Sequence, residues 1–110
     1  MKFKKSEKKV DIAISKNSVP IRLTEERWFH IIENHDDLAG HYDNVLQTIE
    51  DPDYIVEGYE WALIALKGVS KSKFLAVVYK EISKMDGFVI TAYFTSKLSL
   101  EKEVVLWQKK

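Results

Sequence analysis

The sequence predicts a single α+β domain in which two helices near the N-terminus pack on one face of an antiparallel sheet of about four strands. Three observations support this fold class. The chain has 110 residues, the usual length of one compact domain. Apolar residues recur at helical spacing within residues 24–50, and strand-like segments follow one another over residues 54–95. A short strand or hairpin is expected before the helices, and the domain is expected to span residues 10–110.

The N-terminal part predicts an arm followed by a hairpin. Residues 1–9 are rich in lysine and are expected to form a flexible arm. Residues 10–14 alternate between large apolar and other side chains, which indicates a half-buried strand. A turn signal at residues 16–18 leads to residues 19–23, which predict an edge-like strand because Pro20 has no N–H to donate to a ladder.

Two helices are predicted next. Thr24 is a good N-cap, and the two glutamates after it suit the positive end of the helix dipole. The apolar stripe that follows predicts a helix to about residue 35. Gly40 separates it from a second helix over about residues 41–50, which Pro52 closes.

The remainder of the chain predicts strands. Asp86-Gly87 is a typical hairpin turn between the last two of them. Residues 104–107 are apolar and predict either a short helix or an added strand. With the helices on one face of the sheet, the other face is expected to be open. The four expected strands cover residues 54–59, 61–66, 73–82 and 88–95.

Composition excludes several classes of protein. The chain has no cysteine, so disulfides, thiolate metal sites and cysteine nucleophiles are excluded. The charged N-terminus does not resemble a secretory signal. No segment approaches the roughly 20 apolar residues that a membrane span needs. We therefore expect a cytoplasmic protein that does not span a membrane.

The net charge is zero, but the charges are segregated along the chain. Residues 24–60 carry eleven acidic side chains and one basic one, whereas residues 1–23 carry seven basic and two acidic, and residues 61–110 nine basic and four acidic. Such asymmetry can mark a face for nucleic acid or for an acidic partner. The alternative, that the acidic residues only solvate the helices, remains open.

Motifs for cofactor binding are absent from the sequence. It contains no P-loop, no dinucleotide glycine pattern and no nucleophile elbow, so no cofactor is expected. His30 and His35 are five residues apart, which places them about 140° apart around a helix. The remaining histidine, His41, does not complete any common ligand spacing, so no metal site is expected.

Alternation along the last two strands suggests a polar patch. Thr91 and Tyr93 share one face of the last strand, while the apolar residues 88, 90, 92 and 94 share the other and should meet the helices. If Leu75, Val77 and Tyr79 pack inward, Lys80 joins Thr91 and Tyr93 on the open face, a grouping suited to metal-free RNA cleavage. That reaction needs a base for the 2′-hydroxyl, an acid for the leaving 5′-oxygen and cations beside the phosphate. The alternative is that these residues are ordinary strand formers and a strand-end charge.

Four ordered segments resemble a known family. They are Leu23–His35 (Leu-Thr-x-Glu-Arg-Trp-x-His-Ile-x₃-His), Leu46–Asp53 (Leu-x-Thr-Ile-x-x-Pro-Asp), Val77–Lys80 (Val-Val-Tyr-Lys) and Gly87–Tyr93 (Gly-Phe-Val-Ile-Thr-Ala-Tyr). The set resembles small prokaryotic and phage-type proteins of the barnase–EndoU–colicin–RelE-like nuclease superfamily, over about residues 10–107. The resemblance implies two helices on a four-stranded antiparallel sheet and a metal-independent endoribonuclease, often the toxin of a toxin–antitoxin pair.

The resemblance also implies roles for individual residues. His30 and His35 are the acid/base candidates, Lys80 the phosphate contact, and Thr91 and Tyr93 the strand residues of the catalytic site. The candidates for binding the substrate are the two arginines Arg22 and Arg27. The implied partners are RNA and an antitoxin protein.

A second function is compatible with the same sequence. The chain could be a non-catalytic binding module that uses Tyr59, Trp61 or Trp107 as its contact surface. The sequence leaves the oligomeric state open.

Overall fold

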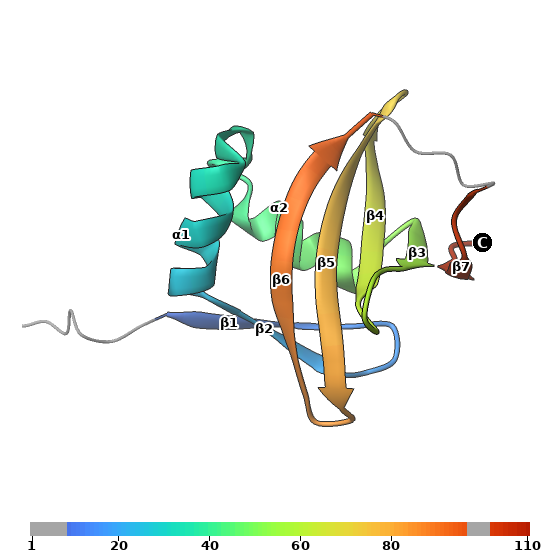
Figure 1. Ribbon diagram of the computed structural model, residues 1–110, viewed down its shortest axis with the longest axis horizontal. Coiled ribbons are helices and arrows are strands. Elements are labelled where there is room, and N and C mark those ends of the chain that lie inside the picture. The colour runs from blue at the N-terminus through green and yellow to red at the C-terminus, as the bar shows by residue number, and fades with distance from the viewer. Residues whose placement is uncertain (1–8, 97–101) are drawn as a thin grey trace, which may run out of the picture.

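The computed structural model describes residues 9–96 and 102–110, so the predicted lysine-rich arm lies outside the described residues except for Lys9. The elements run along the chain as Figure 1 shows. They are β1 (Val10–Ile14), β2 (Pro20–Thr24), α1 (Glu25–Asn34), the 3₁₀ turn η1 (Asp36–Leu38), α2 (Tyr42–Glu50), β3 (Tyr54–Glu57), β4 (Leu63–Ser70), β5 (Lys73–Ser83), β6 (Asp86–Thr95) and β7 (Val105–Gln108).

The strands form one seven-stranded sheet in the order β1-β2-β6-β5-β4-β3-β7. Neighbouring strands are antiparallel except β2 and β6, which pair in parallel through Ile21 with Gly87 and Arg22 with Phe88. The predicted sheet of about four antiparallel strands is therefore wrong in strand number and in strand direction. The N-terminal hairpin docks along β6 instead of only preceding the domain, and the tail adds β7 beside β3.

Gly87 permits the parallel contact between β2 and β6. The chain reverses at Lys84 and Met85, ahead of the predicted Asp86-Gly87 turn, and Gly87 lies buried within β6. A Cβ atom at position 87 would lie 2.5 Å from Ile21 Cδ1 and 2.5 Å from the backbone oxygen of Lys80. Glycine therefore provides space at this position, since no other residue lets the strands approach so closely.

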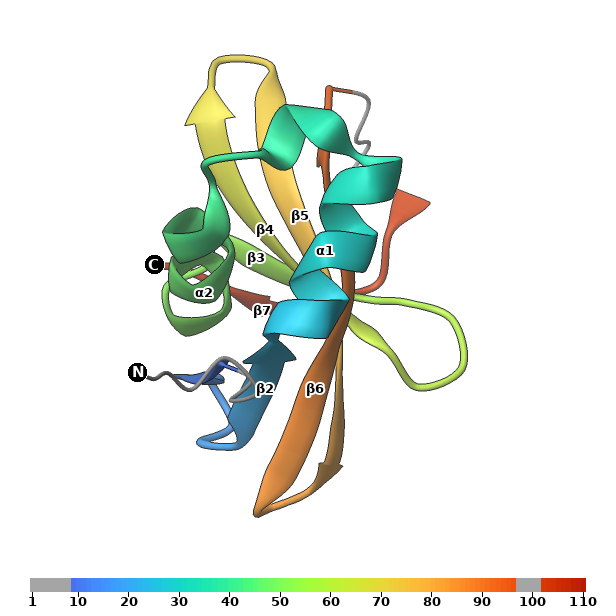
Figure 2. The same cartoon turned by 90° about the vertical axis from the view of Figure 1, so that its left-hand side faces the viewer.

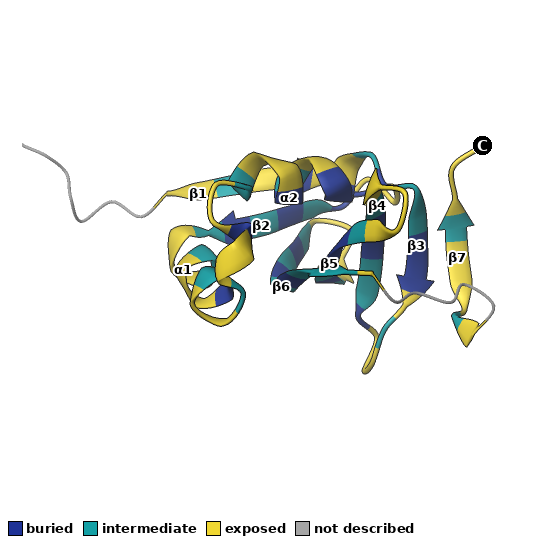
Figure 3. Cartoon of the chain, turned by 90° about the horizontal axis from the view of Figure 1, so that it is seen from above, coloured by how far each residue is buried: buried dark blue, intermediate teal, exposed yellow. Residues whose placement is uncertain are grey.

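The helices begin and end close to the predicted positions. Thr24 Oγ1 accepts a hydrogen bond from the Arg27 N–H at 3.1 Å, which confirms Thr24 as the N-cap of α1. Figures 2 and 3 show α1 alongside β6 and α2 on the same side of the sheet. Within residues 9–96 and 102–110, no helix has the length and apolar character needed to cross a membrane.

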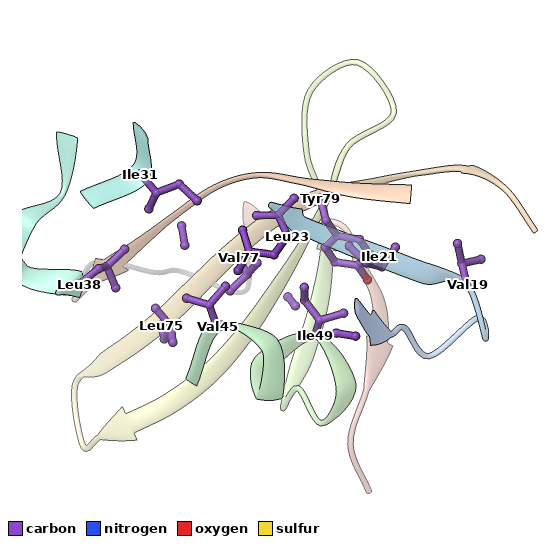
Figure 4. Close-up of a cluster of buried hydrophobic side chains, with 14 residues drawn as sticks. Val19, Ile21, Leu23, Ile31, Leu38, Val45, Ile49, Leu75, Val77 and Tyr79 are labelled. Atoms are coloured by element: carbon purple, nitrogen blue, oxygen red, sulfur yellow. The ribbon is translucent and has the colours of Figure 1, made fainter. Parts of the chain in front are cut away.

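The larger core lies between the helices and the sheet. Val45 and Ile49 of α2 are fully buried there, together with alternate residues of β5, and Figure 4 shows these side chains pointing toward one another. Leu75, Val77 and Tyr79 are each at most 1% exposed. The alternate residues of β5 therefore pack inward, which is the condition that places Lys80 on the opposite face.

The face of the sheet away from the helices, here called the far face, is open only in part. Val56, Leu66 and Ala76 form a second buried cluster on it, and Tyr93 packs partly against them. The prediction of a fully open face is therefore wrong. Its accessible part lies toward β1, β2 and the N-terminal half of β6.

We predict that Gly87→Ala is strongly destabilising, because the added methyl group overlaps Ile21 and a backbone oxygen. A loss of about 3 kcal/mol is expected in the free energy of unfolding, measured in urea. Gly68→Ala is the matched control: a Cβ there would meet its nearest atom, Asp53 Oδ2, at 3.4 Å, and a change within about 0.5 kcal/mol is expected. Equal losses in the two variants would contradict the role given to Gly87.

Candidate functional site

Three side chains line up across adjacent strands of the far face. Arg22 of β2 is paired with Phe88 of β6, and Phe88 is paired with Lys80 of β5. Laterally paired residues point to the same face of a sheet, so these three form one row, which we call the basic row. All three are partly exposed. The row therefore presents a guanidinium group, an aromatic ring and an ammonium group to the solvent.

A small cleft opens at one end of the basic row. It has a volume of about 150 Å³ and is lined by Arg22, Thr24, Arg27, Phe88 and Val89. Arg27 reaches it because Thr24 ends β2 and starts α1 at this point, so the first turn of the helix lies over the cleft. The two predicted substrate-binding arginines thus line the same cleft.

Arg22 already has an anionic partner. Its Nε donates to Asp86 Oδ1 at 2.8 Å and its Nη2 donates to Asp86 Oδ2 at 3.2 Å. The hydrogen bond from Arg22 lowers the pKa of the Asp86 carboxyl below its usual range, and the same contact raises the pKa of Arg22. Among the described residues, neither Arg27 nor Lys80 has an ion-pair partner. Two of the three cations are therefore available to an anionic ligand.

The two predicted strand residues continue along β6 from the basic row. Thr91 pairs with Val78 and Tyr93 with Ala76, so both lie on the far face together with Lys80. Tyr93 is nevertheless part of the second buried cluster. Burial, and then the nearby Glu103, raise the pKa of the Tyr93 phenol above its usual value. Tyr93 can donate a hydrogen bond but is unsuited to act as a base.

The two helix histidines occupy different environments. The side chain of His30 is 58% exposed, and its Nδ1 lies 3.7 Å from Glu33 Oε1. It follows Arg27 by three residues, so the two are neighbours on the surface of α1. His35 caps the C-terminus of α1 and its ring centroid lies 6.0 Å from that of Tyr93.

The seven predicted residues therefore do not form one cleft. Arg22, Arg27 and Lys80 gather around Phe88, and Thr91 lies next along the strand. Tyr93 is five residues beyond Phe88, about 17 Å at the rise of a strand, and His35 is beside it. His30 points to solvent next to Arg27.

Phe88 is the member of the site that the sequence misplaces. Strict alternation puts it on the helix side, but Val78 pairs with Thr91 whereas Tyr79 pairs with Val89. Ile90 is therefore an extra residue, a β-bulge, and the alternation changes phase across it. No feature of the local sequence indicates this bulge.

A second cleft, of about 500 Å³, lies on the helix side and contains the third histidine. His41 Nδ1 lies 3.1 Å from Asn44 Oδ1, and the His41 ring meets Phe94 edge to face with centroids 5.2 Å apart. Lys73 Nζ lies 4.6 Å from the Phe94 ring centroid. Asp37 lines the same cleft and Lys73 is the only lysine or arginine among the described residues of its lining, so this cleft offers a phosphate fewer cations than Arg22, Arg27 and Lys80 do. The sequence could not indicate it, because residues 41 and 94 meet only in the folded chain.

No group of three or more histidine, aspartate and glutamate side chains in the described part of the chain could hold a metal ion. Comparisons of the chain with protein-family models, with curated proteins and with solved structures found no match.

The pKa shift of Asp86 gives a testable pH dependence. A carboxyl whose pKa is lower in the folded state stabilises the fold above its unfolded-state pKa, and this contribution is lost as the pH falls through the folded-state value. We expect the Asp86 carboxyl carbon, followed by NMR, to titrate below the ordinary aspartate range. In Arg22→Gln the titration should move up toward that range. An unchanged Asp86 titration in that variant would contradict the pairing.

Proposed function

We propose that this protein is a metal-independent endoribonuclease that holds the RNA phosphate on Arg22, Arg27 and Lys80. One observation carries the proposal: Arg22 and Arg27 line a single cleft, and Lys80 lies in the same row of the sheet as Arg22. Lys80 has no ion-pair partner among the described residues. Guanidinium groups bind phosphate oxygens through paired N–H donors, and an ammonium group adds a point charge. The site therefore has the groups that a phosphodiester needs.

The distribution of charge supports an anionic substrate on this face. The acidic residues of α1, η1 and α2 are exposed to solvent on the helical layer. On the far face, by contrast, the basic row carries two cations, and Asp86 is the carboxylate paired with it. The protein has no net charge, but its charges are distributed so that this part of the surface is basic. Such a surface attracts a polyanion over short range. We propose the cytoplasm as its site of action, because cellular RNA is found there.

Cleavage would proceed by attack of the 2′-hydroxyl on the adjacent phosphate. A base removes the hydroxyl proton, the bond to the 5′-oxygen breaks, and an acid protonates that oxygen, leaving a 2′,3′-cyclic phosphate. His30 is the candidate base, because the ring nitrogen of a neutral imidazole can accept a proton and because His30 neighbours Arg27 on α1. Lys80 is the candidate proton donor, and the arginines stabilise the charge that builds on the phosphate. We assign His35 to packing against Tyr93.

An active nuclease of this kind would harm the cell that makes it. We therefore propose that it acts as the toxin of a toxin–antitoxin pair, with an antitoxin protein as its partner. An inhibitor that covers the basic row and the cleft at its end would have to neutralise Lys80 and Arg27, for which the described residues supply no ion-pair partner.

The test compares wild type with Lys80→Ala and His30→Ala, on purified single-stranded RNA in the presence of a chelator. Removing an acid or a base costs about 100-fold or more in rate, so both variants should be at least that much slower. Lys71→Ala, which removes an exposed lysine from the β4–β5 turn, is the matched control and should retain wild-type rates.

Induced expression of the same four proteins extends the test to cells. Wild type and Lys71→Ala should stop growth and degrade RNA, while the other two variants should not. Normal growth and intact RNA on induction of wild type would overturn the toxin proposal, and intact purified RNA would overturn the nuclease proposal.

A further inference from the structure

The connection between β3 and β4 exposes two large aromatic side chains. Tyr59 is 93% exposed and Trp61 is 91% exposed, more than any other large hydrophobic residue in the described part of the chain. Burial of rings of this size is strongly favourable, so their exposure indicates a surface that another molecule covers.

This exposure is imposed by a closed hairpin. The Gly58 N–H donates to the Ala62 carbonyl at 2.8 Å, and the Ala62 N–H donates to the Tyr59 carbonyl at 2.9 Å. Between them, Glu60 has a φ of 52° and Trp61 a φ of 70°. This left-handed conformation is unfavourable for a bulky residue and is typical of functional positions when it occurs. The two rings are therefore held outward by a defined turn.

The hairpin stands beside the basic row. Leu63, which follows the hairpin, pairs with Tyr79, the residue before Lys80. Figures 2 and 3 show the β3–β4 connection projecting from the sheet on the side away from α2. A groove of about 420 Å³ at its base is lined by Tyr59 and by Ile64, a residue of the far face. The pairing of β4 with β5 thus places the aromatic hairpin and Lys80 at the same end of the sheet.

We propose that Tyr59 and Trp61 stack on unpaired bases of single-stranded RNA whose backbone lies on the basic row. The inference rests on the proposed function and adds the class of substrate to it. Aromatic rings bind bases of any sequence through their π faces. A duplex keeps its bases stacked inside and cannot offer them, so the hairpin selects single strands.

Charge near the hairpin is consistent with this division of roles. Glu57 and Glu60 are exposed beside the rings, and they disfavour a phosphate at the hairpin itself. Bases carry no charge, so they can occupy the hairpin while the phosphates remain at Arg22, Arg27 and Lys80. The hairpin therefore contributes stacking, and the basic row contributes the electrostatic part of binding.

The experiment measures binding of a fluorescently labelled single-stranded RNA of about 12 nucleotides, by anisotropy at several salt concentrations. Tyr59→Ala and Trp61→Ala should each weaken binding about tenfold and leave the salt dependence unchanged. Trp61→Phe, which keeps a ring, should recover most of the affinity. Lys80→Ala should weaken binding and reduce the salt slope, because it removes a phosphate contact. Blunt duplex RNA of the same sequence should bind weakly to every variant.

Phe29→Ala is the matched control, since Phe29 is a 53% exposed aromatic residue on α1 outside the basic row. It should bind as wild type does. If the hairpin variants also bind as wild type while Lys80→Ala does not, the stacking proposal is overturned and the proposed function stands, and a protein partner becomes the occupant to consider for the hairpin. If wild type itself does not bind RNA, the proposed function and this inference both fail.

Discussion

The pairing of β5 with β6, and the extra residue that it contains at Ile90, determines which side chains reach the far face. On one side of the bulge Phe88 faces away from the helices, and on the other side Thr91 and Tyr93 do so. Regular alternation would place Phe88 and Tyr93 on opposite faces. The bulge therefore places side chains from both ends of β6 on the same face of the sheet. Gly87, three residues before Ile90, leaves the space in which β2 pairs with β6, and this pairing brings Arg22 into the basic row.

Local signals were sufficient to predict the helices, because caps and apolar periodicity act over a few residues. Thr24 starts α1, and α2 ends just before Pro52. The order and direction of the strands cannot be predicted from local sequence, for a physical reason. The parallel contact joins Ile21 to Gly87, and β7 joins β3 through Ile55 and Trp107, so both depend on segments far apart in the chain. An Asp-Gly pair indicates a turn by its sequence, whereas here the glycine provides space for a neighbouring strand.

The candidate site likewise has a part that the sequence predicts and a part that it does not. Lys80 and Thr91 were predicted to share a face because β5 packs its other face into the core, and the register confirms that arrangement. The two helix histidines could not be separated by sequence, because their difference comes from the tertiary neighbours of α1: His35 meets Tyr93, and His30 meets solvent. Phe88 and the aromatic hairpin extend the surface in ways that alternation alone does not reveal. The roles of these residues in RNA cleavage stay predictions.

The account requires RNA to bind the basic row and the cleft beside it, which the first turn of α1 reaches through Arg27, and not η1 or α2, where acidic side chains are exposed. The most direct test is a titration of the isotope-labelled protein with single-stranded RNA, following backbone and arginine side-chain NMR signals. The account predicts that the largest changes occur at Arg22, Arg27 and Lys80 and at their neighbours on β2, β5 and β6. Changes confined to α2, or no saturable change at any residue, would contradict it.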